Sequence, residues 1–394
     1  MSQPHPATPP ATRIAWEAGG VRHTLHWHSE AGNPPPRRVV PADDQMAADA
    51  AYKLACEGTA LLWQGDFQNA RQLLQALGRR IDRARERAQA KLARAAAETT
   101  AAPGQAFHQH RQMQAQRARI LGMLLLPFEA GFRIPLRRAP EVGEACAEAW
   151  PPSLAGMPFA ASLRELQGLI GAHEWRKKGV AIAALGARIH PWYGVFSPVR
   201  GEYLDLLAQT PLPSTELAFD IGVGSGVISA LLARRGVRRV VGTDLDERAL
   251  ACAAANLGDL GLADRVELRR ADLFPEGRAP LVVCNPPWLP ARPAAPIERA
   301  VYDPDSAMLR GFLAGLADHL APGGEGWLIM SDFAEHLGLR APDMLPQAIT
   351  AAGLEVAGKL DIRPRHGKAL DRDDPLHAAR ARETTSLWRL RAKA

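Results

Sequence analysis

The sequence predicts an α/β protein in which a mainly helical N-terminal domain precedes a doubly wound, mostly parallel sheet of seven strands. Three observations predict this fold. From Glu216 to the end of the chain, short apolar runs alternate with runs of helical spacing. The apolar runs are nearly continuous, as expected of parallel strands that are covered on both faces. The last two runs have no helical run between them, which indicates an antiparallel pair at the edge of the sheet.

The composition is that of a globular protein with one large or two medium domains. The chain has 394 residues, of which 47% are hydrophobic and 23% charged. It contains no apolar run long enough to span a membrane, and its first residues, MSQPHPATPP, do not resemble a signal peptide. The four cysteines are far apart, which argues against a structural zinc site or a disulfide framework. We expect a cytoplasmic protein with no metal and no membrane partner. The oligomeric state stays open.

The first 42 residues are rich in Pro and polar residues, and we expect a flexible segment or a small hairpin around Gly19 and Gly20. Residues 43–190 are predicted to form a mainly helical, partly basic accessory domain. Apolar residues recur there at helical spacing through Trp63, and a later helical run ends near Pro127. Within this domain, residues 119–190 show no pattern to which we can assign a fold or a function.

A basic segment extends from Arg79 to Arg119. It carries ten Lys and Arg against Asp82, Glu86 and Glu98, which is a larger excess than the net charge of +6 of the whole chain. Such a segment could bind an anionic partner such as RNA, or it could simply be a solvated helix face.

Residues 191–394 are predicted to be the catalytic domain. Its helical runs begin at Val227, Glu247, Ala307 and Asp343. Its seven predicted strands are ELAFDIG, RRVVGTDL, RVELRRAD, PLVVCN, EGWLIMSD, LEVAGKLDIRP and TSLWRLRA.

A glycine-rich turn follows the first of these strands. In FDIGVGSGVIS, Asp220 precedes Gly222, Gly224 and Gly226, and a helix follows. Glycines permit positive φ and allow a ligand to approach the backbone, and open α/β sheets bind ligands at the carboxyl ends of their strands. The spacing is G-x-G-x-G, which weakens a dinucleotide interpretation. The next strand ends at Asp244, which is placed to accept hydrogen bonds from two ribose hydroxyls.

The third strand ends in RADLF, where Asp272 either accepts a hydrogen bond from an adenine amino group or caps the loop. No P-loop lysine lies near these strand ends. Together they predict a site for a nucleoside ligand without phosphates.

The fourth strand ends in VVCNPPWLP, which contains Asn285, Pro286, Pro287 and Trp288. Two prolines after a buried strand are compatible with a simple exit turn. After three strand ends that carry polar groups, we interpret these four residues as part of the same site.

The motifs DIGVGSG, GTDLD, ADLF and NPPW, in this order, resemble those of class I S-adenosylmethionine-dependent methyltransferases. The resemblance covers about 190–394 and implies a Rossmann-like methyltransferase fold. An N-P-P-aromatic tetrapeptide is typical of amino- and amide-nitrogen methyltransferases, such as the release-factor glutamine enzymes and those that modify adenine N6 or guanine N2 in nucleic acids. Most of these relatives have Tyr or Phe where this chain has Trp288.

The resemblance implies S-adenosylmethionine as cofactor and transfer of its methyl group to a nitrogen. The Asn285 side-chain oxygen and the Pro286 carbonyl would accept the two N–H groups of the target, which localises the nitrogen lone pair and stabilises developing positive charge. Pro287 would help to hold this backbone, and Trp288 would stack on the target or act through a cation–π effect.

Further site residues are expected on both sides of these motifs. Upstream, HPWYGVFSPVRGEYLDLL resembles the segment that covers the cofactor in this class, which implies contacts from Phe196 and Pro198. Downstream, four residues are candidates for the substrate mouth: Glu298, Tyr302, Asp303 and Asp305. Asp303 and Asp305 are better explained as caps of the next helix.

The first target to consider is a glutamine side chain of a protein, and the second is an exocyclic amine of an RNA or DNA base. The basic segment favours RNA, but the N-terminal half has no recognisable RNA-binding signature. Two other classes stay open: a binding protein of the same fold that has lost catalysis, and a nicotinamide oxidoreductase. The intact Asn285-Pro286-Pro287 argues against the former, and the glycine spacing argues against the latter.

Overall fold

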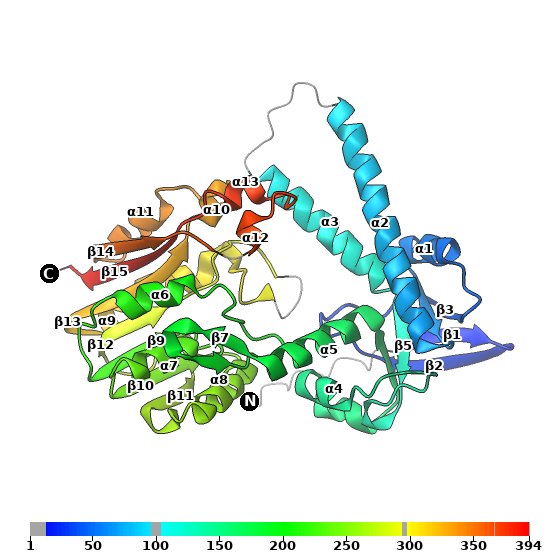
Figure 1. The fold of residues 1–394 in the computed structure, drawn as a ribbon, viewed down its shortest axis with the longest axis horizontal. Helices are drawn as coiled ribbons and strands as arrows, with labels where there is room; N and C mark the ends of the chain where they lie inside the picture. The colour runs from blue at the N-terminus through cyan, green and yellow to red at the C-terminus, as the bar shows by residue number, and fades with distance from the viewer. Residues whose placement is uncertain (1–12, 96–103, 294–297, 366, 394) are drawn as a thin grey trace, which may run out of the picture. The chain divides into compact units, whose positions relative to one another are not determined.

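A computed structural model describes residues 13–95, 104–293, 298–365 and 367–393 (Figure 1). The chain divides into two compact units. The N-terminal unit is Met1–Thr100 with Arg111–His173, and the C-terminal unit is Ala101–His110 with Glu174–Ala394. Each unit contains a β-sheet of its own.

The C-terminal unit contains the predicted seven-stranded sheet, in the order β11-β10-β9-β12-β13-β15-β14. The first five strands are parallel, and β15 is antiparallel to both of its neighbours. This confirms a mostly parallel doubly wound sheet with an antiparallel pair at one edge. The strands are β9 (Leu217–Ile221), β10 (Arg239–Asp244), β11 (Val266–Arg270), β12 (Ala279–Cys284), β13 (Leu320–Ser331), β14 (Leu354–Ile362) and β15 (Thr385–Ala392).

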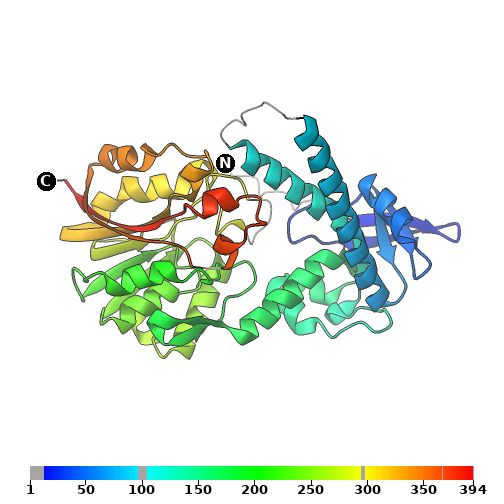
Figure 2. The same cartoon turned by 45° about the horizontal axis from the view of Figure 1, so that its top comes forward.

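Helices cover both faces of this sheet (Figures 1 and 2). Two buried clusters lie on its two faces, and α6, α7 and α8 contribute to one of them, α9 and α11 to the other. Successive residues of β12 alternate between the clusters, with Leu281 and Val283 in one, Val282 and Cys284 in the other. Burial on both faces therefore explains the continuous apolar runs. The helices are α6 (Glu202–Gln209), α7 (Val227–Arg234), α8 (Glu247–Asp259), α9 (Ala307–His319), α10 (Phe333–His336), α11 (Met344–Ala351), α12 (Gly367–Leu370) and α13 (His377–Arg380). A small antiparallel pair, β7 (Val180–Ile182) and β8 (Ala187–Ile189), precedes α6.

The N-terminal unit is built around a six-stranded sheet of order β1-β2-β6-β5-β4-β3. The hairpin predicted around Gly19 and Gly20 is present, because β1 and β2 pair on either side of them. The strands are β1 (Arg13–Ala18), β2 (Val21–Trp27), β3 (Arg38–Ala42), β4 (Thr59–Trp63), β5 (Leu124–Phe128) and β6 (Phe159–Ser162). The helices are α1 (Ala48–Cys56), α2 (Phe67–Ala95), α3 (Gln105–Leu121), α4 (Gly143–Ala149) and α5 (Leu163–Lys178), of which α3 and α5 continue into the other unit.

The sheet corrects two predictions made for this half of the chain. The helical run predicted to reach Trp63 ends at Cys56, and TALLW forms β4. The run predicted as a helix to Pro127 ends at Leu121, and LLLPF forms β5. Both strands are short apolar runs, which periodicity alone cannot distinguish from buried helix. Helices hold more of this unit's residues than strands do, but its centre is a sheet and not a helical bundle.

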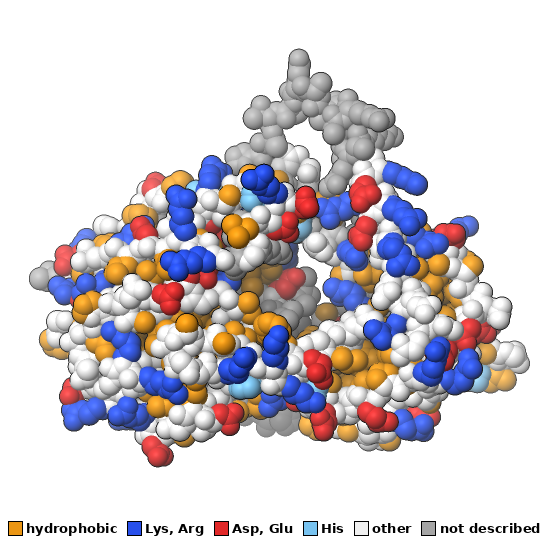
Figure 3. Space-filling model, in the orientation of Figure 1, with side chains coloured by type: hydrophobic (Ala, Val, Ile, Leu, Met, Phe, Trp, Pro, Cys, Tyr) orange, Lys and Arg blue, Asp and Glu red, His pale blue; other side chains and the backbone are white. Residues whose placement is uncertain are grey.

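The basic segment is divided between α2 and α3, and residues 96–103 with the acid at 98 lie outside the described residues. Part of its charge is used within the unit, since Arg80 pairs with Asp49 and Arg117 with Asp82. Figure 3 shows both positive and negative side chains along α2. In the described ranges, none of the helices combines the length and apolar character needed to cross a bilayer.

Candidate functional site

The carboxyl ends of four neighbouring parallel strands form one edge of the large sheet. Asp244 at the end of β10 is in register with Arg270 of β11, and Thr243 with Ile221 of β9. Ile221 is in turn in register with Cys284 of β12, so Asn285 and Gly222 both follow directly after paired residues. The strand order reverses between β9 and β12, where doubly wound folds bind ligands. The fold therefore brings the glycine turn and the tetrapeptide to the same place.

The three glycines of the turn have φ values of +76° at Gly222, +52° at Gly224 and +80° at Gly226. A Cβ on Gly222 would lie 2.7 Å from Met308 Cε, and one on Gly226 would lie 3.2 Å from the backbone of Ala253 in α8. Next to Gly224 the nearest atoms are at 3.9 and 4.0 Å, so space is open there. Gly226 thus serves helix packing, while Gly224 leaves backbone accessible to a ligand.

Asp220 is completely buried at the end of β9. The Ser229 hydroxyl donates a hydrogen bond of 2.6 Å to its Oδ2, whereas its Oδ1 is buried without a hydrogen-bond partner among the described residues. Burial raises the pKa of this carboxyl to about 6, and the Ser229 hydrogen bond opposes the rise. An anionic oxygen held in this way favours a cationic ligand group.

Asp244 is half-buried and connects its strand to the glycine turn. Its Oδ2 accepts a hydrogen bond of 3.1 Å from the Gly224 N–H, and its Oδ1 accepts one of 3.0 Å from the Asp246 N–H. Burial is the main cause that raises its pKa. Each carboxylate oxygen keeps further acceptor capacity, as a ribose diol would require.

The third strand end departs from this compact arrangement. Asp272 lies two residues beyond β11 and is exposed. The next residue, Leu273, has φ of +66°, and its carbonyl accepts a hydrogen bond from the Thr243 hydroxyl. Phe274 stacks on His319 of α9, with ring centroids 4.2 Å apart. Two residues of this turn therefore serve packing, and Asp272 alone is available to a ligand at the sheet edge.

In the tetrapeptide, the Trp288 indole N–H donates a hydrogen bond of 3.0 Å to Asn285 Oδ1. Pro286 is buried, and the other three residues are half-buried. The bond determines which end of the Asn285 amide faces the ring and leaves its oxygen with capacity for one more donor. No Phe could make this bond, so it is a property of the Trp in this chain.

Arg200, which the sequence did not single out, lies beside Trp288 and belongs to a group of four polar residues. The Arg200 guanidinium carbon lies 5.1 Å from the centroid of the Trp288 ring. Arg200 also donates a hydrogen bond of 2.8 Å to Glu383 Oε1, which accepts another of 2.6 Å from the Ser331 hydroxyl. Glu202 is buried, with its carboxylate 3.6 Å from Arg200 Nε. The only available signal was the position of Arg200 and Glu202 inside the upstream segment, because Glu383 is almost 100 residues beyond the tetrapeptide.

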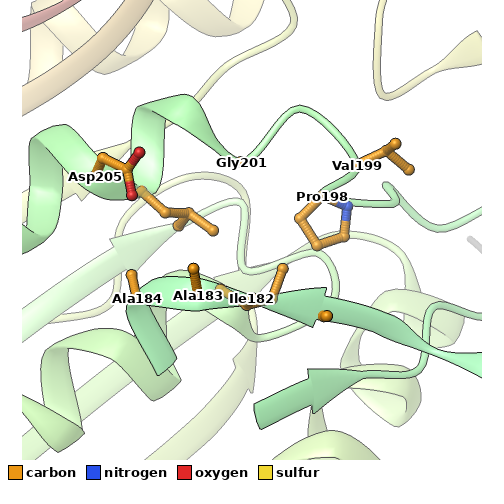
Figure 4. A pocket seen from close by; sticks show the side chains of 9 residues that line it. Ile182, Ala183, Ala184, Pro198, Val199, Gly201 and Asp205 are labelled. Carbon is orange, nitrogen blue, oxygen red and sulfur yellow. The ribbon is translucent and has the colours of Figure 1, made fainter. Parts of the chain in front are cut away.

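The upstream segment has two different environments. Phe196 lies beside the glycine turn, since its Cβ is 4.0 Å from a Cβ built on Gly224, and it packs against the same cluster as Trp288. Pro198 instead lines a small cavity of about 150 Å³ between β7 and the start of α6, in which Asp205 is the one charged lining residue (Figure 4). The structure therefore places Phe196 beside the glycine turn and Pro198 at this cavity.

The downstream candidates also separate. Asp303 accepts hydrogen bonds from the backbone N–H groups of Met308 and Leu309, which confirms that it caps α9. Asp305 is exposed with φ of +56°. Tyr302 packs in an apolar cluster that includes Leu289, directly after the tetrapeptide. Glu298 is half-buried, and its carbonyl accepts hydrogen bonds from two N–H groups of the same turn.

No group of three or more potential metal ligands occurs in the part of the chain that the structure describes. The side chains at the sheet edge offer hydrogen-bond acceptors and an aromatic ring. It suits a nucleoside with a cationic group and a second ligand that brings N–H donors.

Residues 189–345 match the family model described as Methyltransferase small domain. The matched range includes the glycine turn, Asp244, Asp272 and the tetrapeptide. This match confirms the resemblance to methyltransferases for this stretch of the chain.

Relatives whose names give different targets each match part of the chain. The release factor glutamine methyltransferase of Cereibacter sphaeroides is 35% identical over 161 residues, covering 37% of this chain and 56% of the relative. The ribosomal protein L11 methyltransferase of Pelotomaculum thermopropionicum is 34% identical over 140 residues, covering 35% of this chain and 38% of the relative. The tRNA1(Val) (adenine(37)-N6)-methyltransferase of a Shewanella species is 25% identical over 175 residues, covering 42% of this chain and 70% of the relative. The chain thus spans less than two thirds of the length of the first two relatives.

Proposed function

We propose that this chain, in which residues 189–345 match the Methyltransferase small domain model, is an S-adenosylmethionine-dependent N-methyltransferase that acts on an amide or exocyclic amine nitrogen. One observation carries the proposal. The glycine turn after β9 and Asn285-Pro286-Pro287-Trp288 after β12 follow residues paired in register, at the point where the strand order reverses. The residues proposed to bind a nucleoside are thereby adjacent to the acceptors proposed to bind the N–H groups of the target.

The residues present fit this cofactor. Asp244 supplies acceptors for a ribose diol, Gly224 leaves its backbone open, and Phe196 offers an apolar wall. The unpartnered buried oxygen of Asp220 complements a ligand that carries positive charge. Asp272 is the acceptor we assign to the adenine amino group. When bound, S-adenosylmethionine supplies an electrophilic methyl group.

The chain's own groups would orient the nucleophile. An amide or aryl-amine nitrogen has a delocalised lone pair and is a poor nucleophile. The side-chain oxygen Oδ1 of Asn285 and the backbone carbonyl of Pro286 are two acceptors in a segment whose backbone two prolines restrict. If they accept the two N–H groups of the target, the lone pair localises and the charge that develops on nitrogen is stabilised. Positioning then supplies most of the rate enhancement, and no strong base is needed.

A glutamine side chain of a protein is the first target we propose. Support comes from the release factor glutamine methyltransferase, to which this chain is 35% identical over 161 residues. An RNA base is the second candidate, supported by the basic segment in α2 and α3 and by the similarity to a tRNA adenine methyltransferase. The two targets share the chemistry of a planar, N–H-bearing nitrogen.

Two measurements test the function and its target. Calorimetry with S-adenosylmethionine should show binding. A wild-type protein that does not bind it would exclude the proposed enzymatic function. Lysate of cells that lack this chain, incubated with the protein and tritiated S-adenosylmethionine, should acquire label. Label that resists nuclease and is lost with protease identifies a protein target, and the opposite pattern identifies RNA. Binding without any labelled product would favour a binding protein of the same fold.

A further inference from the structure

Arg200, Glu383, Trp288 and Asn285 form a continuous series of contacts. We propose that Arg200, anchored by Glu383, is a positioning residue that holds the Trp288 ring, and that the ring in turn holds the Asn285 amide ready for the acceptor nitrogen. The inference rests on the proposed function and adds to it residues outside the tetrapeptide.

The first contact orients the amide. Trp288 Nε1 donates to Asn285 Oδ1 at 3.0 Å, across a turn in which Pro286 and Pro287 restrict the backbone. An Asn side chain that rotated by half a turn would present its NH₂ group to the indole N–H, two donors facing each other. The bond therefore keeps the oxygen, and not the NH₂ group, toward the ring and the space beside it.

The second contact limits movement of the ring. The Arg200 guanidinium lies 5.1 Å from the ring centroid of Trp288, within the range of a cation–π interaction. Trp288 also packs against the apolar clusters on both faces of the sheet. A planar guanidinium can lie parallel to the ring while its N–H groups bond elsewhere, which the ammonium of Lys cannot do.

The third contact anchors the guanidinium. The Glu383 side chain is fully buried, and its Oε1 accepts from both Arg200 and the Ser331 hydroxyl. Arg200 keeps 24% of its side chain exposed, so the buried partner determines the geometry of the pair. Charge-assisted hydrogen bonds to a buried carboxylate are short and strongly directional. Glu383, at the entry to β15, thus transmits the rigidity of the sheet to the tetrapeptide.

The indole N–H of Trp288 reports on this arrangement without any substrate. In protein labelled with ¹⁵N-tryptophan, its NMR signal is the one that Trp288→Phe removes. The signal should shift in Asn285→Ala, because the acceptor is lost, and should shift or broaden in Arg200→Lys and Glu383→Gln. Both of the latter variants keep a polar side chain of similar volume, and thermal unfolding shows whether they fold.

Lys359→Ala is the matched control. Lys359 lies 4.8 Å from the ring centroid of Trp388, on the β14–β15 pair, so the variant removes a comparable cation from a different tryptophan. It should leave the Trp288 signal and methyl transfer unchanged.

Methyl transfer to the labelled lysate fraction provides the functional measurement. Arg200→Lys, Glu383→Gln and Trp288→Phe should lower turnover on the order of tenfold or more, with the dissociation constant of S-adenosylmethionine unchanged. Unchanged signals in Arg200→Lys and Glu383→Gln would overturn the proposal, as would altered signals with normal turnover. Failure of the wild type to bind S-adenosylmethionine would instead overturn the proposed function, and the NMR signals would still show whether the four side chains form one unit.

Discussion

The Ser229 hydroxyl donates a hydrogen bond of 2.6 Å to Asp220 Oδ2, while Asp220 Oδ1 has no hydrogen-bond partner among the described residues. Half of a completely buried carboxylate is therefore satisfied within the protein. The pKa of Asp220 is raised from 3.8 to about 6, mainly by burial. An arrangement that destabilises the free protein is expected where a ligand supplies the missing partner.

Asp220→Asn should stabilise the protein at neutral pH. Because the folded-state pKa lies above the unfolded value, stability falls as pH rises from about 4 to 6, and the loss is complete above pH 6. A pKa rise of this size corresponds to about 3 kcal/mol, part of which the buried amide N–H of Asn would offset. Urea unfolding should show a gain of about 1–2 kcal/mol at pH 8 and little gain at pH 4. S-adenosylmethionine affinity should fall in the same variant, and equal stability at pH 8 would contradict the argument.

Asp244→Ala should weaken S-adenosylmethionine binding about tenfold to a hundredfold, because a charged acceptor is worth roughly 1.5–3 kcal/mol for a hydrogen bond. Calorimetry measures the change directly. The neighbouring Asp246 is a suitable control, since its carboxylate accepts from the Arg248 N–H at 2.9 Å and caps α8. Asp246→Ala should lower thermal stability and leave the affinity unchanged. Equal effects of the two variants on affinity would show that Asp244 acts only through the fold.

Gly226→Ala should destabilise the protein by about 1–3 kcal/mol, because Gly226 has φ of +80° and an added methyl would lie 3.2 Å from Ala253. Gly258→Ala is the opposite case. Gly258 is within α8, and a methyl group added there would have no other atom within 4 Å. Ala at this position should therefore stabilise the helix by roughly 0.5–1 kcal/mol. Chemical denaturation of both variants checks the pair, and a neutral Gly226→Ala would mean that the turn can relax.

Asn285→Ala should reduce turnover about a hundredfold or more, by analogy with the loss of one hydrogen-bonding group in the transition state. S-adenosylmethionine affinity should stay close to that of the wild type, because the proposed role of Asn285 is to bind the target nitrogen and not the cofactor. Tritium transfer to the labelled fraction and calorimetry measure the two quantities. Normal turnover would reduce Asn285 to a turn residue.

The seven strands of the large sheet and the helices α7, α8, α9 and α11 were predictable from the sequence, whereas β7, β8, α6, α10, α12 and α13 were not. The strands β9, β10 and β12 begin and end within a residue or two of the predicted positions. Beyond the β1–β2 hairpin, the N-terminal sheet was not predicted, because β4 and β5 are five-residue apolar runs that follow helical patterns closely. Only pairing with distant strands distinguishes such runs from buried helix, and pairing is a tertiary property.

The sequence alone determined the chemistry of the sheet edge: glycines where positive φ is needed, carboxylates at strand ends, and an acceptor between a buried strand and two prolines. These features are local, since backbone conformation and side-chain type decide them within a few residues. The tertiary structure alone decided the partners of these groups. It placed Glu383 and Ser331 beside Arg200, and Arg200 beside Trp288, from positions up to 183 residues apart. Such contacts depend on how the β15 entry packs beside the end of β13, and no local pattern encodes that distance.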